Sequence, residues 1–176
     1  MLLNIFSPRK RNDEAEFRQL VEQNQRRLYW HLRRILNSHE DAEDVLQETF
    51  YKAYKSYGKF DGKCAVYTWL YRIATNEALR FMEKRGPEYE LLDNIGDNIR
   101  SENDDTDEQL NEQRILLQKA IRTLPEKQKL VFNLRFYDEM EYEQICEILG
   151  ISRSAAKTNF HLAKEKIKSY IQSQPL

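Results

Sequence analysis

The stretch from Glu141 to Lys168 limits the fold more than any other part of this chain. Apolar residues recur at helical spacing up to Leu149, Gly150 follows, and a second helical pattern begins after Ser152. Glycine ends helices readily because it enters the left-handed conformation at little cost, and a serine side chain caps the following helix by accepting from its free amides. The pattern therefore predicts a helix, a tight turn and a second helix, an arrangement typical of the helix-turn-helix.

The second helix of this stretch has two distinct faces. Its apolar stripe is narrow and consists of Ala156, Phe160, Ala163 and Ile167. Its other face carries the basic and hydroxyl side chains expected of a helix that reads the major groove: Arg153, Ser154, Lys157, Thr158, His161 and Lys164. An ordinary helical hairpin with a solvated basic face would show a similar pattern, so the rest of the chain must distinguish the two.

Charge is unevenly distributed along the 176 residues. The net charge is only −1, but residues 1–85 hold 16 Lys and Arg against 12 Asp and Glu, and residues 114–176 hold 11 against 7. Residues 86–113 hold 1 basic residue against 10 acidic ones. Two mildly basic segments are therefore joined by a strongly acidic one.

Hydrophobic periodicity and the low content of 5 Gly and 4 Pro favour an all-α protein. We expect two small helical domains joined by an acidic linker, the second domain ending in the helix-turn-helix. The expected divisions are a flexible basic tail at 1–12, an N-terminal helical domain at 13–86, the acidic linker at 87–112 and a C-terminal helical domain at 113–174.

Several classes of protein are disfavoured by what the sequence lacks. No run approaches the roughly 20 apolar residues of a membrane span, and the N-terminus does not resemble a signal peptide, so we expect a cytoplasmic protein without membrane insertion. Cys64 and Cys146 are far apart and the 3 histidines are isolated, which predicts no metal site and no cofactor. No nucleophile motif or phosphate loop is present, so we expect no enzyme.

The helix expected at about 65–84 combines aromatic, basic and amide side chains beside a loop that contains Asp61 and Gly62. Such side chains suit single-stranded nucleic acid, because rings stack on unpaired bases for about 1–3 kcal/mol each. The aromatic residues Trp69 and Tyr71 can equally pack inside a three-helix core. The sequence leaves both interpretations open.

Several separate stretches now fall into one order: DAEDVLQETFYKAY, TWLYRIATNEA, an acidic linker and LPEKQKLVFNLRFYDEMEYEQICEILGIS. In this order they resemble a bacterial RNA polymerase sigma factor of the extracytoplasmic-function (group IV) type, over roughly residues 14–171. The resemblance implies a protein that binds core RNA polymerase and directs it to promoter DNA. It also implies an anti-sigma factor as a further partner.

The resemblance implies a role for each domain. The N-terminal domain would dock on the β′ clamp helices through Asp44, Gln47, Glu48 and Lys52. The same domain would melt and read the minus-ten element through Lys59, Phe60, Asp61, Lys63, Trp69, Arg72, Asn76 and Arg80. The C-terminal domain would bind the β flap and read the minus-thirty-five element through the polar face of the last helix, the six residues from Arg153 to Lys164 named above.

The chain departs from the family pattern at four positions. Glu141 stands where Ser or Thr usually caps a helix, and Val66 where Phe is common. Leu162 stands where a basic residue is frequent, and Arg80 where an acidic residue is common. These departures bear on the promoter sequence and not on the class of protein.

The alternative is a stand-alone helix-turn-helix regulator that binds duplex DNA without polymerase. Such a protein needs a dimerisation element to place two reading helices at half-site spacing, and none is evident in the sequence.

Overall fold

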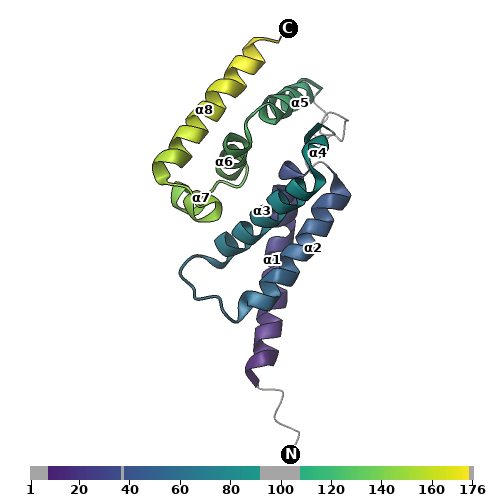
Figure 1. Cartoon of the computed structure of the whole chain (residues 1–176), viewed down its shortest axis with the longest axis vertical. Helices are drawn as coiled ribbons and strands as arrows, with labels where there is room; N and C mark the ends of the chain where they lie inside the picture. Colours follow the sequence, from purple (N-terminus) through teal and green to yellow (C-terminus); the bar gives the residue numbers. More distant parts are fainter. Residues whose placement is uncertain (1–7, 37, 92–107, 175–176) are drawn as a thin grey trace, which may run out of the picture. The chain divides into compact units, whose positions relative to one another are not determined.

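The computed structural model describes residues 8–36, 38–91 and 108–174, and these residues form eight helices and no strands. In chain order the helices are α1 (Pro8–Ile35), α2 (His39–Tyr57), α3 (Val66–Arg85), α4 (Pro87–Leu91), α5 (Glu108–Arg122), α6 (Glu126–Phe136), α7 (Tyr142–Leu149) and α8 (Arg153–Gln172) (Figure 1). The chain divides into two compact units between Arg85 and Gly86. The described residues thus confirm the all-helical prediction.

Helical structure extends further than the sequence predicted. α1 begins at Pro8, inside the stretch expected to be a tail, and α4 begins at Pro87, inside the expected linker. Both helices start at a proline, which suits a first turn because the missing N–H has no partner there in any helix. α5 begins at Glu108, also inside the expected linker. The rest of that linker, 92–107, lies outside the described residues.

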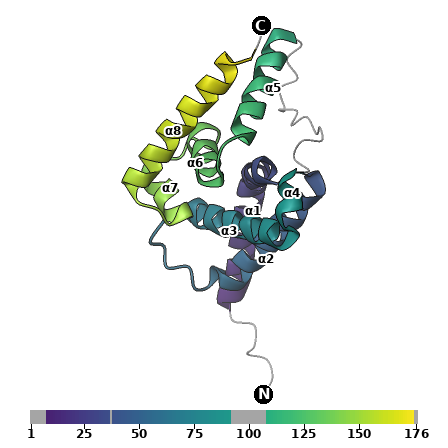
Figure 2. The same cartoon turned by 45° about the horizontal axis from the view of Figure 1, so that its top comes forward.

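The first unit is a bundle in which α1, α2 and α3 all pack against one another (Figures 1 and 2). A serine directly before a helical pattern predicts a helix cap, and Ser38 caps α2, since its hydroxyl oxygen accepts from the Asp41 N–H at 3.0 Å. Apolar side chains from all three helices fill the centre, among them Leu28, Leu32, Ala42, Val45, Leu70 and Ala74. The core therefore sits between the three helices, and α3 has buried side chains facing both of its neighbours.

A buried polar contact joins α1 to α3. His31 Nε2 lies 2.9 Å from Thr75 Oγ1, and the Thr75 hydroxyl donates to the Tyr71 carbonyl at 2.7 Å. Because the hydroxyl has only one hydrogen, the imidazole N–H is the donor in the first of these bonds. The contact helps to fix how the two helices face each other, since a shift of either would break this buried hydrogen bond of the His31 imidazole.

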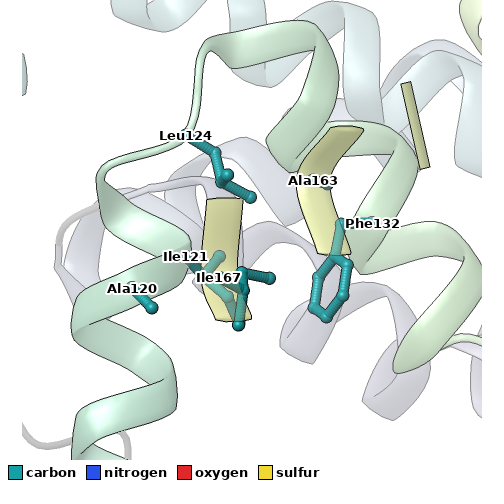
Figure 3. Packing of buried hydrophobic residues seen from close by; sticks show 6 residues of the cluster. All are labelled: Ala120, Ile121, Leu124, Phe132, Ala163 and Ile167. Carbon is teal, nitrogen blue, oxygen red and sulfur yellow. The ribbon is translucent and has the colours of Figure 1, made fainter. Parts of the chain in front are cut away.

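The second unit has a core shared by α5, α6 and α8, with α7 packed against α6 and α8. Figure 3 shows the central side chains gathered between the helices: Ala120, Ile121, Leu124, Phe132, Ala163 and Ile167. Small residues on α8 let the neighbouring helices approach closely. This packing uses the narrow apolar stripe of α8 and leaves the rest of that helix facing outward.

Candidate nucleic-acid interface

The helix-turn-helix of the second unit forms as the sequence predicted. Gly150 has a φ of 65° and its N–H donates to the Cys146 carbonyl at 2.9 Å, which ends α7. Ser152 then caps α8, its hydroxyl oxygen accepting from the Ala155 N–H at 3.1 Å. Buried Ile145 on α7 contributes to the core below the turn. These local bonds set the direction in which α8 leaves the turn.

The start of α7 is held by a residue that the sequence analysis did not single out. The backbone N–H of Glu141 donates to Gln144 Oε1 at 2.9 Å. Gln at this position is one half of the capping-box pattern, and this signal could have been found in the sequence. Gln144 therefore holds the helix start where the usual Ser or Thr cap is missing.

All six side chains predicted to read the minus-thirty-five element are exposed on α8. Three of them make contacts within the unit. Arg153 pairs with Glu143 at 2.5 Å, Lys157 Nζ lies 5.8 Å from the centre of the Tyr142 ring, and Lys164 Nζ lies 4.9 Å from the centre of the Phe160 ring. These contacts are at the surface. The polar face of α8 is therefore available to a ligand without disturbing the core.

The loop before α3 is fixed at its tip by Asp61. The Lys63 N–H donates to Asp61 Oδ1 at 3.1 Å, and Lys63 Nζ lies 3.1 Å from Oδ2. The backbone hydrogen bond from Lys63, helped by its ammonium group, lowers the pKa of the Asp61 carboxyl below its usual range. Gly62 adopts a φ of 71°, which the turn requires. Lys59 and Lys63 are exposed beside it.

The sequence allowed two environments for Trp69 and Tyr71, and the structure places both residues in the core of the first unit. Trp69 is 8% exposed and Tyr71 is 0% exposed. The Trp69 ring lies 5.0 Å from that of Phe60 and 6.4 Å from that of Tyr57, so it packs beneath the loop. Phe60 itself is half-buried. Burial on α3 is wider than one stripe because the helix packs against both α1 and α2.

The remaining predicted residues of the first unit lie on two helices. Asp44, Gln47 and Glu48 are exposed on α2, and Arg72 and Asn76 are exposed on α3. Neither group is needed to fill the core. Both are therefore placed where a large partner can reach them.

Glu77 joins the two predicted sets, and the sequence analysis missed it. This residue of α3 is 8% exposed. Its carboxylate lies 2.6 Å from Lys52 Nζ on α2 and accepts from Arg80 Nη1 at 2.8 Å. Lys52 Nζ also lies 3.6 Å from Glu48 Oε1. The spacing of Glu77 and Arg80 is a local signal for an ion pair, but the partner on α2 depends on how the helices pack.

The described part of the chain contains no group of three or more His, Cys, Asp or Glu side chains that could hold a metal ion. No helix among the described residues is both long and apolar enough to cross a membrane.

Two family models match this chain, and the first match ends close to the boundary between the two compact units. Residues 20–88 match the family model of Sigma-70 region 2, and residues 114–167 match that of Sigma-70, region 4. The ECF RNA polymerase sigma-E factor of Haemophilus influenzae is 33% identical, with 93% of this chain and 91% of the relative covered. The ECF RNA polymerase sigma factor SigW of Bacillus subtilis is 29% identical, with 93% and 92% covered.

A solved structure supports the fold. The sigma factor RpoE from Bartonella quintana, in complex with the anti-sigma factor NepR, matches with a TM-score of 0.70 at 23% identity. The match covers 91% of this chain and 99% of that one.

Proposed function

The chain belongs to the ECF RNA polymerase sigma factors, non-enzymatic proteins that direct RNA polymerase to promoters through regions 2 and 4, and on this premise we propose how its parts divide the work. α2 docks on the β′ clamp helices of core polymerase. The loop at 59–64 and α3 melt and read the minus-ten element. α8 reads the minus-thirty-five element.

The exposed polar face of α8 is the observation that carries this proposal. The N-terminal half of α8 enters the major groove, as the second helix of this motif does in other DNA-binding proteins. Lys157, Thr158 and His161 project together into the groove toward base edges, while the nearby Lys164 contacts phosphates. The phosphate contacts make binding weaker as salt rises.

Because Trp69 is buried, we propose that it supports the loop and that another aromatic residue contacts the minus-ten element. Opening a duplex costs about 1–2 kcal/mol of stacking per step, and a protein offsets this cost by holding an unstacked base. Trp69 supports the loop from beneath, and the half-buried ring of Phe60 is the aromatic surface offered to a base. Exposed Arg72 and Asn76 supply hydrogen bonds to the separated strand.

Polymerase contacts are proposed on both units. Asp44, Gln47 and Glu48 form the docking face of α2. In the second unit, an apolar groove of about 500 Å³ lies between α5, α6 and α8 and is proposed to receive the β flap. Its apolar lining consists of Leu117, Phe132, Phe136, Phe160, Ile167 and Ile171.

The remaining partners follow from the same premise. The Bartonella quintana structure pairs a sigma factor with an anti-sigma factor, and we propose such a partner for this chain too. On the same premise, this chain acts in the cytoplasm, where core polymerase and promoter DNA are found. The stand-alone regulator is less well supported, because this chain matches Sigma-70 region 2 as well as Sigma-70, region 4, which contains the helix-turn-helix.

Run-off transcription with purified core polymerase on fragments of genomic DNA tests the initiation function. We expect transcripts whose start sites share two upstream elements, and none from core polymerase alone. Binding of the free chain to duplex DNA without any dependence on polymerase would support the stand-alone regulator instead.

Co-purification with core polymerase tests the docking face. Asp44→Arg combined with Gln47→Ala is expected to reduce the fraction of chain bound to core by tenfold or more, since a like charge is placed against the complementary surface. Lys55→Ala, an exposed change on the same helix, is the matched control. Equal recovery of the double variant and the control would remove the docking assignment.

A further inference from the structure

We propose that Leu162 reads the 5-methyl group of a thymine in the minus-thirty-five element. This inference rests on the proposed role of α8 and adds a residue that determines specificity. Leu162 is 41% exposed and lies outside the line of buried residues by which α8 packs against its neighbours.

The position of Leu162 on α8 places it beside the polar reading face. It follows Thr158 by one helical turn and is adjacent to His161 in sequence, and both neighbours are exposed. Residues one turn apart lie on the same side of a helix, so a partner that contacts Thr158 also covers Leu162. The leucine is therefore continuous with the surface through which this helix binds DNA.

Packing within the unit does not account for this leucine. Other exposed apolar residues contact further rings or line the groove: Phe136 stacks on Phe132 with ring centres 5.1 Å apart, and Ile171 lines the apolar groove. Leu162 belongs neither to the core cluster of α5, α6 and α8 nor to the groove lining. Single exposed leucines are common on protein surfaces, so the meaning of this one lies in its place on a DNA-reading helix.

The chemistry of the major groove identifies the target. An A·T pair presents the thymine methyl group there, and apolar side chains contact it. Leucine offers no hydrogen bond, so covering the polar edge of a G·C pair would leave a donor or acceptor without a partner. A basic side chain, frequent at this position in the family, would instead select guanine. Leucine therefore shifts the preference at its base pair to thymine.

Uracil substitution tests the contact, because uracil is thymine without the methyl group. The holoenzyme is bound to a promoter mapped by run-off transcription, and each thymine of the minus-thirty-five element is replaced by uracil in turn, on either strand. We expect one replacement to weaken binding by about fourfold, the effect of burying one methyl group.

Variants at the same position identify the protein side of the contact. Leu162→Ala should bind the thymine promoter more weakly and lose its sensitivity to that one uracil, whereas Leu162→Met should keep it. Leu162→Arg should prefer guanine at the same position. Thermal unfolding checks that each variant is folded, and an exposed site on a helix predicts little change.

Two results overturn the inference. Either no uracil weakens binding, or Leu162→Ala remains as sensitive as the parent chain. Both results are obtained with a holoenzyme that initiates at the promoter, so they leave the proposed function standing. A holoenzyme that initiates at no promoter would instead remove the proposed function, and this inference with it.

Discussion

The two units differ in how their predicted functional residues are tied to the fold. On α8, all six predicted reading residues are exposed and their contacts are at the surface. On α2 and α3, Trp69 is buried in the core, and Lys52 and Arg80 share the carboxylate of Glu77. Changes to Trp69, Lys52 or Arg80 are therefore expected to alter folding and the proposed function together, whereas changes on the polar face of α8 are expected to alter mainly the proposed function.

The position of each helix in its unit explains the difference. α3 packs against both α1 and α2, so side chains around much of its circumference are buried. The buried residues of α8 are Ala156, Ala163 and Ile167, which form one narrow line. A helix buried along one line has more surface to present to a ligand.

Trp69→Ala should give the largest change. Removing a buried tryptophan that packs against Phe60 and Tyr57 is expected to lower the free energy of unfolding by about 3–5 kcal/mol. Chemical denaturation of the full chain, followed by circular dichroism, measures it. Trp69→Phe is the milder control. A loss below about 1 kcal/mol would mean that Trp69 contributes little to the stability of the first unit and is no more constrained by the fold than the exposed residues of α8.

Glu77→Ala should give a smaller loss, about 1–2 kcal/mol. Hydrogen bonds to charged groups contribute more than neutral ones, but Lys52 and Arg80 are partly exposed and remain solvated. Glu83→Ala, an exposed change on the same helix, is expected to stay within about 0.5 kcal/mol.

A double-mutant cycle of Glu77→Ala with Lys52→Met isolates the pair across α2 and α3. We expect the two changes to be non-additive by at least about 0.5 kcal/mol. Additive effects would mean that the two helices are not coupled through this carboxylate. Lys52 would then be as independent of the packing of its unit as the exposed residues of α8 are.

Glu139→Gly should stabilise the second unit slightly. Glu139 has a φ of 53° in the turn between α6 and α7, a conformation that costs a non-glycine residue about 1–2 kcal/mol. The greater freedom of glycine in the unfolded chain offsets part of this, so we expect a gain of about 0.5–1 kcal/mol. The thermal midpoint measures it, with Glu139→Ala as the control that keeps a side chain. A loss of stability in Glu139→Gly would contradict the strain.

Lys157→Ala combined with His161→Ala should leave the free energy of unfolding within about 0.5 kcal/mol, the smallest effect. Transcription from promoters that depend on the minus-thirty-five element should nevertheless fall, while co-purification with core polymerase is unchanged. Joint loss of transcription and polymerase association would contradict the separation between reading and docking.

Features set by neighbouring residues could be predicted from the sequence. Ser38, Gly150 and Ser152 were assigned as helix ends, and the structure confirms all three, because capping depends on residues within one turn. The helix-turn-helix followed from them. The exposed face of α8 followed from its periodicity.

Features set by packing between helices could not be predicted. The burial of Trp69 and Tyr71 could not be predicted, because it depends on two neighbouring helices and not on spacing within α3. The helical spacing of Tyr54 from Phe50 predicts that it lies in the buried face of α2. Tyr54 is instead 51% exposed and meets Phe17 of α1 edge to face at 5.3 Å. The ion pair of Glu77 with Lys52 joins α3 to α2 and leaves no signal in one sequence.

The exposure of the α8 reading face has a consequence for how this chain can change over generations. Its side chains can be replaced one at a time with little loss of stability. If they read DNA as proposed, the set of promoters can therefore drift while the scaffold stays the same. Lys52, Glu77 and Arg80 of the first unit lack this freedom, since they constrain one another. On the proposed roles, recognition of the minus-thirty-five element should therefore diverge between related chains before the residues around Glu77 do.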